Sequence, residues 1–192
     1  MLRFLPGAVC AVILATPSLV HADTWHIDES NSSAEFSVRH MGISTVRGAF
    51  KKVRGTVEYN SSDLSKASVN VTIDAASIDT RVEMRDEHVR GPDFLDVAKY
   101  PTITFHSMRV EPEGKGKLKV TGDLTMHGVT KTVVLDVDGP SAAVKDPQGG
   151  SHMGASGTTK INREEFGVSG TPMMVSDEVT ITLDVELFKP PA

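Results

Sequence analysis

Alternation of apolar and polar residues constrains this chain of 192 residues more than any other feature of its sequence. The clearest run lies near the C-terminus, where every second residue is aliphatic: Val179, Ile181, Leu183, Val185 and Leu187. Successive side chains of a β-strand point to opposite faces, so such a run predicts a strand with one buried and one solvated face. Further strands are expected within residues 25–28, 34–39, 45–50, 55–59, 67–73, 103–105, 118–126, 133–137 and 151–161.

Short clusters of turn-forming residues separate these runs. They are Glu113–Gly116, His127-Gly128, Asp138–Pro140 and Asp146–Gly150. Gly, Pro and Asp favour the backbone conformations that tight turns need. Roughly eight to ten short antiparallel strands with such turns form a sandwich or a barrel. The residue pattern by itself leaves both architectures open.

One segment, Thr80–Arg90, has helical rather than alternating character. Thr80 and Glu83 have the spacing of a capping box, and acidic residues precede basic ones, as the helix dipole prefers. Gly91-Pro92 ends the pattern. We expect one short helix over this segment, followed by a helical turn with Asp93 as its N-cap.

Residues 1–22 have the layout of a secretory signal. Arg3 supplies a positive charge, an apolar stretch follows, and short side chains lead up to a cleavage point at its end. Pro6 and Pro17 interrupt the stretch, which is shorter than the ~20 apolar residues of a membrane-spanning helix. We expect cleavage to leave residues 23–192 as a single domain outside the cytoplasm.

The charge balance and the cysteine content exclude several functions. The chain has a formal net charge of −5, and the loss of Arg3 leaves 19 basic against 25 acidic side chains. Such a chain is not expected to bind nucleic acid or an anionic membrane surface. The one cysteine, Cys10, lies in the signal, so no disulfide, thiolate metal site or cysteine nucleophile is expected. No later segment is apolar enough for stable membrane insertion.

Several motifs, in order along the chain, resemble those of one family. They are Phe36-Ser37-Val38-Arg39-His40, Val46-Arg47-Gly48-Ala49-Phe50, Ser77-Ile78-Asp79-Thr80, Arg85–Asp96, Tyr100–Phe105, Gly122–Lys131 and Ile161–Gly167. Together they cover the mature chain almost from end to end. The sequence resembles the YceI-like family of periplasmic, lipocalin-like proteins, also called polyisoprenoid-binding.

The resemblance implies an all-β fold, an eight-stranded antiparallel up-and-down β-barrel with a long apolar cavity. It implies a periplasmic carrier that holds an isoprenoid lipid, an isoprenoid quinone or a similar amphiphile, with no other cofactor and with homodimers in some members. A barrel of eight strands has room either for packed side chains or for one small ligand. The alternative is therefore a filled barrel that serves as a structural, stress or electron-transport accessory protein.

Candidate wall residues follow from the parity of the strands. Inward positions carry mostly Val, Leu and Ile, and burying a polyprenyl tail against them gains roughly 25 cal/mol per Å². The expected wall consists of Phe36, Val38, Phe50, Val69, Val71, Ile73, Ile103, Phe105, Leu118, Val120, Leu124 and Met126, with Met84, Phe94 and Leu95 as a lid. The alternative for each residue is ordinary core packing.

Three polar residues are placed to meet a ligand's head group. His40 shares the parity of the inward residues of its strand, and Arg85 and His88 lie on one helix face at i, i+3 spacing. They suit a hydroxyl, a quinone oxygen or a phosphate. The alternative is structural, a network of Arg85, Asp86, His88 and Asp93 that fixes the helix to the barrel.

Catalysis has little support in the sequence. Six histidines follow the signal, at positions 26, 40, 88, 106, 127 and 152. They form no His-x-His pair or His-Glu-x-x-His motif, and Gly-x-Ser-x-Gly is absent. We expect a binding protein with no metal site rather than an enzyme, and a histidine-based metal hydrolase is the weakest alternative.

Overall fold

The computed structural model describes residues 22–191, which form strands, short 3₁₀ turns and one α-helix. The predicted signal, residues 1–22, lies outside these residues except for Ala22. In chain order the elements are β1 (Asp23–Ile27), η1 (Glu29–Asn31), β2 (Ser33–His40), β3 (Ser44–Phe50), β4 (Val53–Tyr59), η2 (Leu64–Lys66), β5 (Ser68–Asp74), η3 (Ala75–Ser77), β6 (Ile78–Asp79), α1 (Glu83–Arg90), β7 (Thr102–Gly114), β8 (Lys117–Met126), β9 (Val129–Asp138), β10 (Val144–Lys145), β11 (Ser151–Asn162), η4 (Arg163–Phe166) and β12 (Val175–Lys189).

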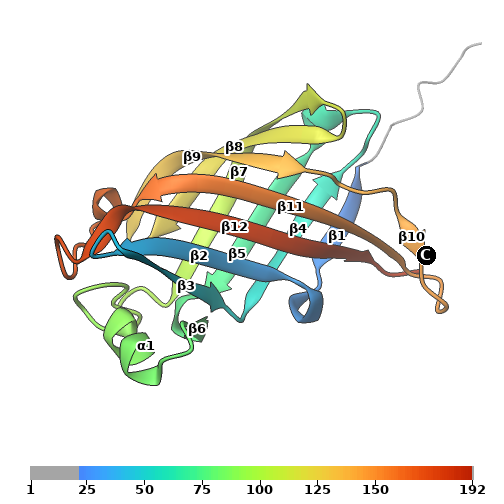
Figure 1. Cartoon of the computed structure of the whole chain (residues 1–192). Coiled ribbons are helices and arrows are strands. Elements are labelled where there is room, and N and C mark those ends of the chain that lie inside the picture. The colour runs from blue at the N-terminus through green and yellow to red at the C-terminus, as the bar shows by residue number, and fades with distance from the viewer. Residues whose placement is uncertain (1–21, 192) are drawn as a thin grey trace, which may run out of the picture.

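The strands close into an eight-stranded antiparallel barrel (Figure 1). Neighbours in the barrel are also neighbours in sequence, and β12 completes the ring by pairing with β11 on one side and with β1 and β2 on the other. The β11–β12 ladder runs from Ser151 opposite Lys189 to Asn162 opposite Glu178. The predicted up-and-down, lipocalin-like barrel is confirmed, and its closure leaves no free strand edge in the ring.

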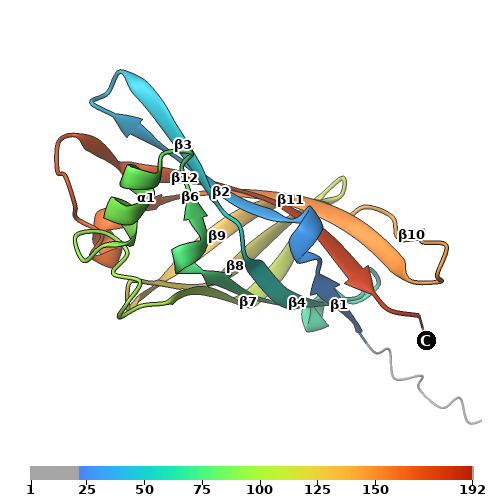
Figure 2. The same ribbon diagram turned by 90° about the horizontal axis from the view of Figure 1, so that it is seen from below.

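Some barrel strands consist of two elements in succession. β1 continues as β2, β3 continues as β4, and β5 continues as β6 after η3. Because the chain bends at η1 and at residues 51–52, the β2–β3 hairpin leans away from the ring, as Figure 2 shows. The hairpin still belongs to the wall, because β2 pairs with β12 from Asp184 to Val175.

The helix begins later than the sequence predicts. α1 starts at Glu83, and its N-cap, Val82, makes no side-chain capping bond, so the predicted start at Thr80 and the capping box are wrong. Thr80 instead donates from its backbone N–H (2.8 Å) and its hydroxyl to the buried carboxylate of Asp86. That bond occupies the threonine, and the left-handed backbone at Arg81 (φ 65°) interrupts the helical conformation.

The barrel has two structurally different ends. At the first, called the helix end, lie the β2–β3 turn, α1 and the β11–β12 connection; at the second, called the termini end, lie the start of β1, β10 and the end of β12 (Figures 1 and 2). One buried cluster packs around β1 and the end of β12 and contains Trp25, Ile27, Ala34, Val53, Met153 and Leu187. A larger cluster follows the barrel interior to the helix end, where it includes Phe94, Leu95 and Phe166.

Candidate ligand-binding cavity

The barrel encloses a cavity of about 610 Å³. Small-molecule sites usually have volumes of roughly 300–1,000 Å³. Inward side chains such as Val71, Val133 and Ile181 line the cavity and remain only half-buried, because the space they face is not filled by protein. The structure therefore has a hollow barrel, and the filled-barrel alternative does not describe it.

All the predicted site residues except Met84 line this cavity. From the strands these are Phe36, Val38, His40, Phe50, Val69, Val71, Ile73, Ile103, Phe105, Leu118, Val120, Leu124 and Met126, and from α1 and the turns after it Arg85, His88, Phe94 and Leu95. Met84 is 81% exposed and lies outside the wall, so its predicted place in the lid is wrong. Residues 85, 88 and 89 line the cavity, whereas Met84, in the first turn of α1, lies about a quarter turn away from the centre of that face. That the other residues contact a ligand stays a prediction.

Part of the cavity wall lies outside the predicted site. β9 and β12 contribute inward residues that the alternation had already placed in strands: Val133, Leu135, Val137, Val179, Ile181, Leu183, Val185 and Leu187. Their parity was the available signal.

Two strand glycines make room for aromatic rings along the wall. A β-carbon on Gly48 would lie 2.5 Å from the ring of Phe36, which is its partner in the β2–β3 ladder. A β-carbon on Gly122 would lie 2.5 Å from the ring of Phe105 on the neighbouring strand. Glycine within a strand often marks such a close approach. Each ring lies over the backbone of the next strand and contributes apolar wall surface there.

The cavity opens to solvent at the helix end. Ser44, His88 and Met174 all line it and are also exposed, and they come from β3, α1 and the β11–β12 connection. His40, on β2, completes this rim. The predicted polar residues therefore converge near the opening.

Arg85 and Asp86 fix the helix at this opening. Arg85 donates from Nε to the Thr80 hydroxyl and from Nη2 to the Thr80 carbonyl, both at 2.8 Å. The structural alternative is therefore realised for Arg85 and Asp86. A guanidinium has five N–H donors, so these two bonds leave Arg85 able to bind a head group as well. His88 packs edge-on against Phe94, with ring centroids 5.1 Å apart.

Arg163 holds the β11–β12 connection in place and was not anticipated from the sequence. Its side chain is buried at 3% exposure and donates to the carbonyls of Val168, Gly170, Val175 and Ser176 at 2.6 to 3.1 Å. Two of these carbonyls lie in the connection and two at the start of β12, so a single cation organises the backbone on both sides. Arg163 belongs to the motif Ile161–Gly167, but the sequence does not indicate which backbone carbonyls its guanidinium contacts.

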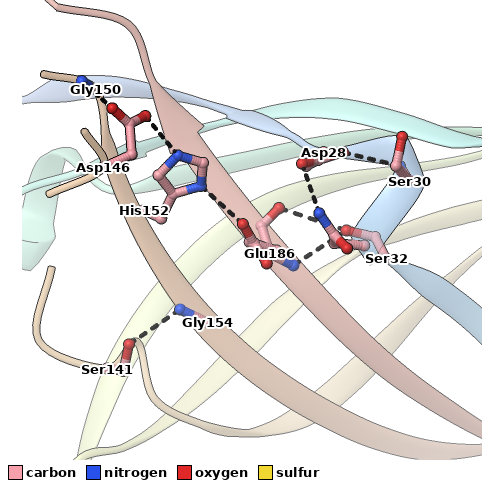
Figure 3. Close-up of polar contacts among 10 residues, drawn as sticks. Asp28, Ser30, Ser32, Ser141, Asp146, Gly150, His152, Gly154 and Glu186 are labelled. Carbon is pink, nitrogen blue, oxygen red and sulfur yellow. Dashed lines mark hydrogen bonds and ion pairs between the residues drawn. The ribbon is translucent and has the colours of Figure 1, made fainter. Parts of the chain in front are cut away.

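A second polar cluster lies at the termini end, on the outside of the barrel (Figure 3). The ring of His152 lies between two carboxylates, with Nε2 3.0 Å from Asp146 and Nδ1 2.7 Å from Glu186. The hydrogen bond to Asp146, and then that to Glu186, raise the pKa of His152, while His152 lowers the pKa of Asp146. The cluster fixes the loop after β10 to β12, because Asp146 also accepts from the Gly150 N–H at 3.0 Å.

Within residues 22–191, no group of three or more His, Cys, Asp and Glu side chains is arranged to hold a metal ion. None of the helices in the described part of the chain combines the length and apolar character needed to cross a membrane.

The comparisons with known proteins agree with the barrel. A UPF0312 protein of Vibrio cholerae is 36% identical over 188 residues, which cover 97% of this chain and 98% of the relative. Burkholderia cenocepacia BcnA has a similar crystal structure, with a TM-score of 0.74, 29% identity, and coverage of 83% of this chain and 98% of BcnA.

A third similar structure is a polyisoprenoid binding domain from Saccharophagus degradans, implicated in plant cell wall breakdown. It has a TM-score of 0.66 and 16% identity over 86% of this chain and 98% of that domain, so the likeness concerns the fold. The YceI-like domain family matches residues 25–187. With this match over nearly all of the barrel, and with a relative that aligns along almost its whole length, the chain belongs to the YceI-like family.

Proposed function

We propose that the protein is an exported binding or carrier protein that holds an amphiphile with a long apolar tail inside its barrel. The observation that carries the proposal is the cavity of about 610 Å³ with a wall of aliphatic and aromatic side chains. Burial of each CH₂ group in such a cavity is worth about 0.8 kcal/mol, so a tail of several carbons binds without many polar contacts. In this proposal the protein holds its ligand and does not convert it chemically.

The ligand class proposed is an isoprenoid lipid, an isoprenoid quinone or a similar amphiphile. The narrow apolar barrel suits a flexible chain, and His40, Arg85 and His88 at its opening suit a head group with oxygen acceptors. The Saccharophagus degradans domain of the same fold supports the isoprenoid class, since it is described as polyisoprenoid binding.

The compartment proposed is the periplasm. Residues 1–22 have the sequence of a cleavable signal. An apolar molecule that must cross an aqueous compartment needs a protein to shield its tail from water. Export and a hollow apolar barrel are therefore consistent parts of one function.

Native mass spectrometry of the purified mature protein, followed by organic extraction, tests this function. We expect a mass adduct and an extractable amphiphile, or stoichiometric binding when an isoprenoid quinone or polyprenol is added. No adduct and no binding of either added compound would refute the proposal.

Variants of the wall locate the ligand. Leu124→Arg places a charge on the cavity wall and should abolish retention, whereas Thr182→Lys, on the exposed face of β12, should retain the ligand fully. Because Leu124→Arg also threatens folding, Val133→Phe serves as a second variant that fills the cavity with apolar volume. Equal retention by all three proteins, each with a cooperative thermal transition, would rule out the assigned cavity.

A further inference from the structure

Exposed apolar side chains gather at the helix end of the barrel. Met41 (57% exposed) and Ile43 (79%) form the tip of the β2–β3 hairpin, and Met173 (98%) lies in the β11–β12 connection. Met174, Val82 and Met84 are also exposed and lie at the same end. Groups of exposed apolar residues on a protein surface mark interaction sites more often than isolated ones do.

The hairpin tip and the β11–β12 connection form one continuous edge. The Met41 N–H donates to the Met174 carbonyl at 2.7 Å, and His40 is paired with Val175. Residues 166–174 contain no charged residue. Met41, Ile43, Met173 and Met174 therefore make a single apolar edge beside the opening of the cavity, here called the leading edge.

The hairpin behind the leading edge is cationic, although the whole chain is acidic. Residues 36–57, which run from β2 through β3 into β4, contain five basic side chains and no acidic one: Arg39, Arg47, Lys51, Lys52 and Arg54. Of these, Arg39 and Arg47 lie in the hairpin, whose one carboxylate, Glu35, lies near its base. Lys51 and Lys52 are paired with Asp79 and Asp74. Among the described residues, no carboxylate pairs with Arg39 or Arg47, which lie nearest the tip. Arg39 is fixed there, because it donates to the Gly42 carbonyl at 2.7 Å and to the Thr45 hydroxyl at 2.8 Å.

We propose that the leading edge docks reversibly on an anionic phospholipid surface, with Met41, Ile43 and Met173 entering the interface and Arg39 and Arg47 meeting lipid phosphates. Apolar side chains flanked by Lys or Arg bind membrane interfaces in this way, and the attraction grows with the fraction of anionic lipid. The α1 side of the opening carries charges of both signs, among them Glu83, Glu87 and Arg85, whereas the hairpin tip has arginines and no carboxylate, so the hairpin side makes the charged contact.

A bilayer matches this edge better than a second copy of the chain. A two-fold dimer through the leading edge would place the same patch on both subunits, and the unpaired arginines would then face one another. An anionic surface meets them with opposite charge. The docking also places the opening of the cavity against lipid. It needs no stable insertion, but it departs from the expectation that the acidic chain avoids anionic membrane surfaces, because the charge near the hairpin tip is positive whereas the net charge of the whole chain is negative.

Vesicle flotation of the mature protein tests the docking. The wild type should float with vesicles of phosphatidylcholine and phosphatidylglycerol, less with phosphatidylcholine alone, and less as salt is raised. Ile43→Asp combined with Met173→Asp should lower the bound fraction by about tenfold. Arg47→Gln should remove part of the difference between the two vesicle types. Val144→Asp, a change at an apolar side chain of 67% exposure at the termini end, is the matched control and should float like the wild type.

The docking would be overturned if the wild type does not float, or if the double variant and the control float equally. It would also be overturned if sedimentation without vesicles shows a dimer for the wild type and a monomer for the double variant, because the leading edge would then be a dimer interface. Thermal melts of all variants exclude unfolding as the cause. The inference extends the proposed function without depending on a loaded cavity. Leu124→Arg should lose its cavity ligand and still float, which separates failure of the docking from failure of the carrier function.

Discussion

The helix end and the termini end of this barrel are built from the same strands, yet they differ in what covers them. At the termini end, Trp25 (5% exposed), Met153 (4%) and Leu187 (2%) form a compact core, and His152 fixes the nearest loop from outside. At the helix end, the covering segments leave an opening and present exposed methionines. The strand pattern does not create this difference, because β11 and β12 run through both ends. The connecting segments do.

The segments at the open end have strong local anchors in addition to the buried Phe94, Leu95 and Phe166. At the helix end these anchors are polar and buried: Arg163 with its loop carbonyls, and Asp86 with Thr80. At the termini end the anchor His152 is partly exposed, and apolar packing supplies most of the order. This contrast predicts where a substitution is costly.

The largest effect is expected from Arg163→Ala. The change leaves buried loop carbonyls without donors and should lower the free energy of unfolding by at least about 3 kcal/mol. Urea denaturation measures the loss, and Lys160→Ala, an exposed change on β11, is the control. If both variants unfold at the same urea concentration, the helix end is not held by this arginine.

A leucine pair on β12 compares a fully buried position of the cavity wall with a half-buried one. Leu187→Ala removes a side chain that is 2% exposed and should cost about 2–5 kcal/mol. Leu183→Ala, on the same face but half-buried against the cavity, should cost less than half as much, because part of its surface contacts no other atoms. Thermal unfolding of both variants provides the measurement. Equal losses would mean that the barrel is filled at Leu183.

The smallest effect is expected from the pH dependence of the His152 cluster. Its carboxylate partners raise the pKa of His152, so the contact stabilises the fold fully below the ordinary histidine value of about 6.5 and the stabilisation is lost as the pH rises through the raised value. The melting temperature of His152→Gln should therefore fall below the wild type near pH 6 and approach it toward about pH 9.

Asp28, Asp146 and Glu186 are the charged groups around this ring, and all are carboxylates. His106→Gln is the control, since the hydrogen bond of the His106 ring is to the side-chain amide of Asn70, at 2.9 Å. A difference for His152→Gln that grows with rising pH would contradict the assigned sign.

The all-β fold was predictable because alternation is a property of each strand by itself. The ring of eight strands came from the family resemblance, since alternation allows a sandwich equally well. The start of α1 was missed for a physical reason. Two carboxylates follow Thr80 closely in sequence, those of Glu83 and Asp86. The spacing favoured a capping box with Glu83, but Thr80 donates to the buried carboxylate of Asp86 instead.

Cavity residues were predictable as a class, whereas the hollow itself was not. Parity identifies Val71 or Leu124 as inward, but an inward residue packs in a filled barrel as well. The open space depends on which strands are neighbours and on contacts such as those of Phe36 with Gly48 and Phe105 with Gly122. Those contacts join residues that the sequence does not relate. The exposure of Met41 and Ile43 at the hairpin tip could not be predicted either. Apolar and polar residues alternate in a strand that projects from the barrel just as they do in a strand within it.

The closure of the ring by β12 sets an order for folding. β12 is the last strand of the described residues, and its register joins His26 to Phe188, near opposite ends of those residues. Every other neighbouring pair of strands is linked by a comparatively short connection, so we expect those pairs to form early. Closure of the ring joins the residues that are farthest apart in sequence, so we expect it to be the slowest step. An incomplete chain without residues 175–189 has an open sheet with two free edges and no enclosed volume. The enclosed cavity therefore forms only when β12 has paired with both of its neighbours.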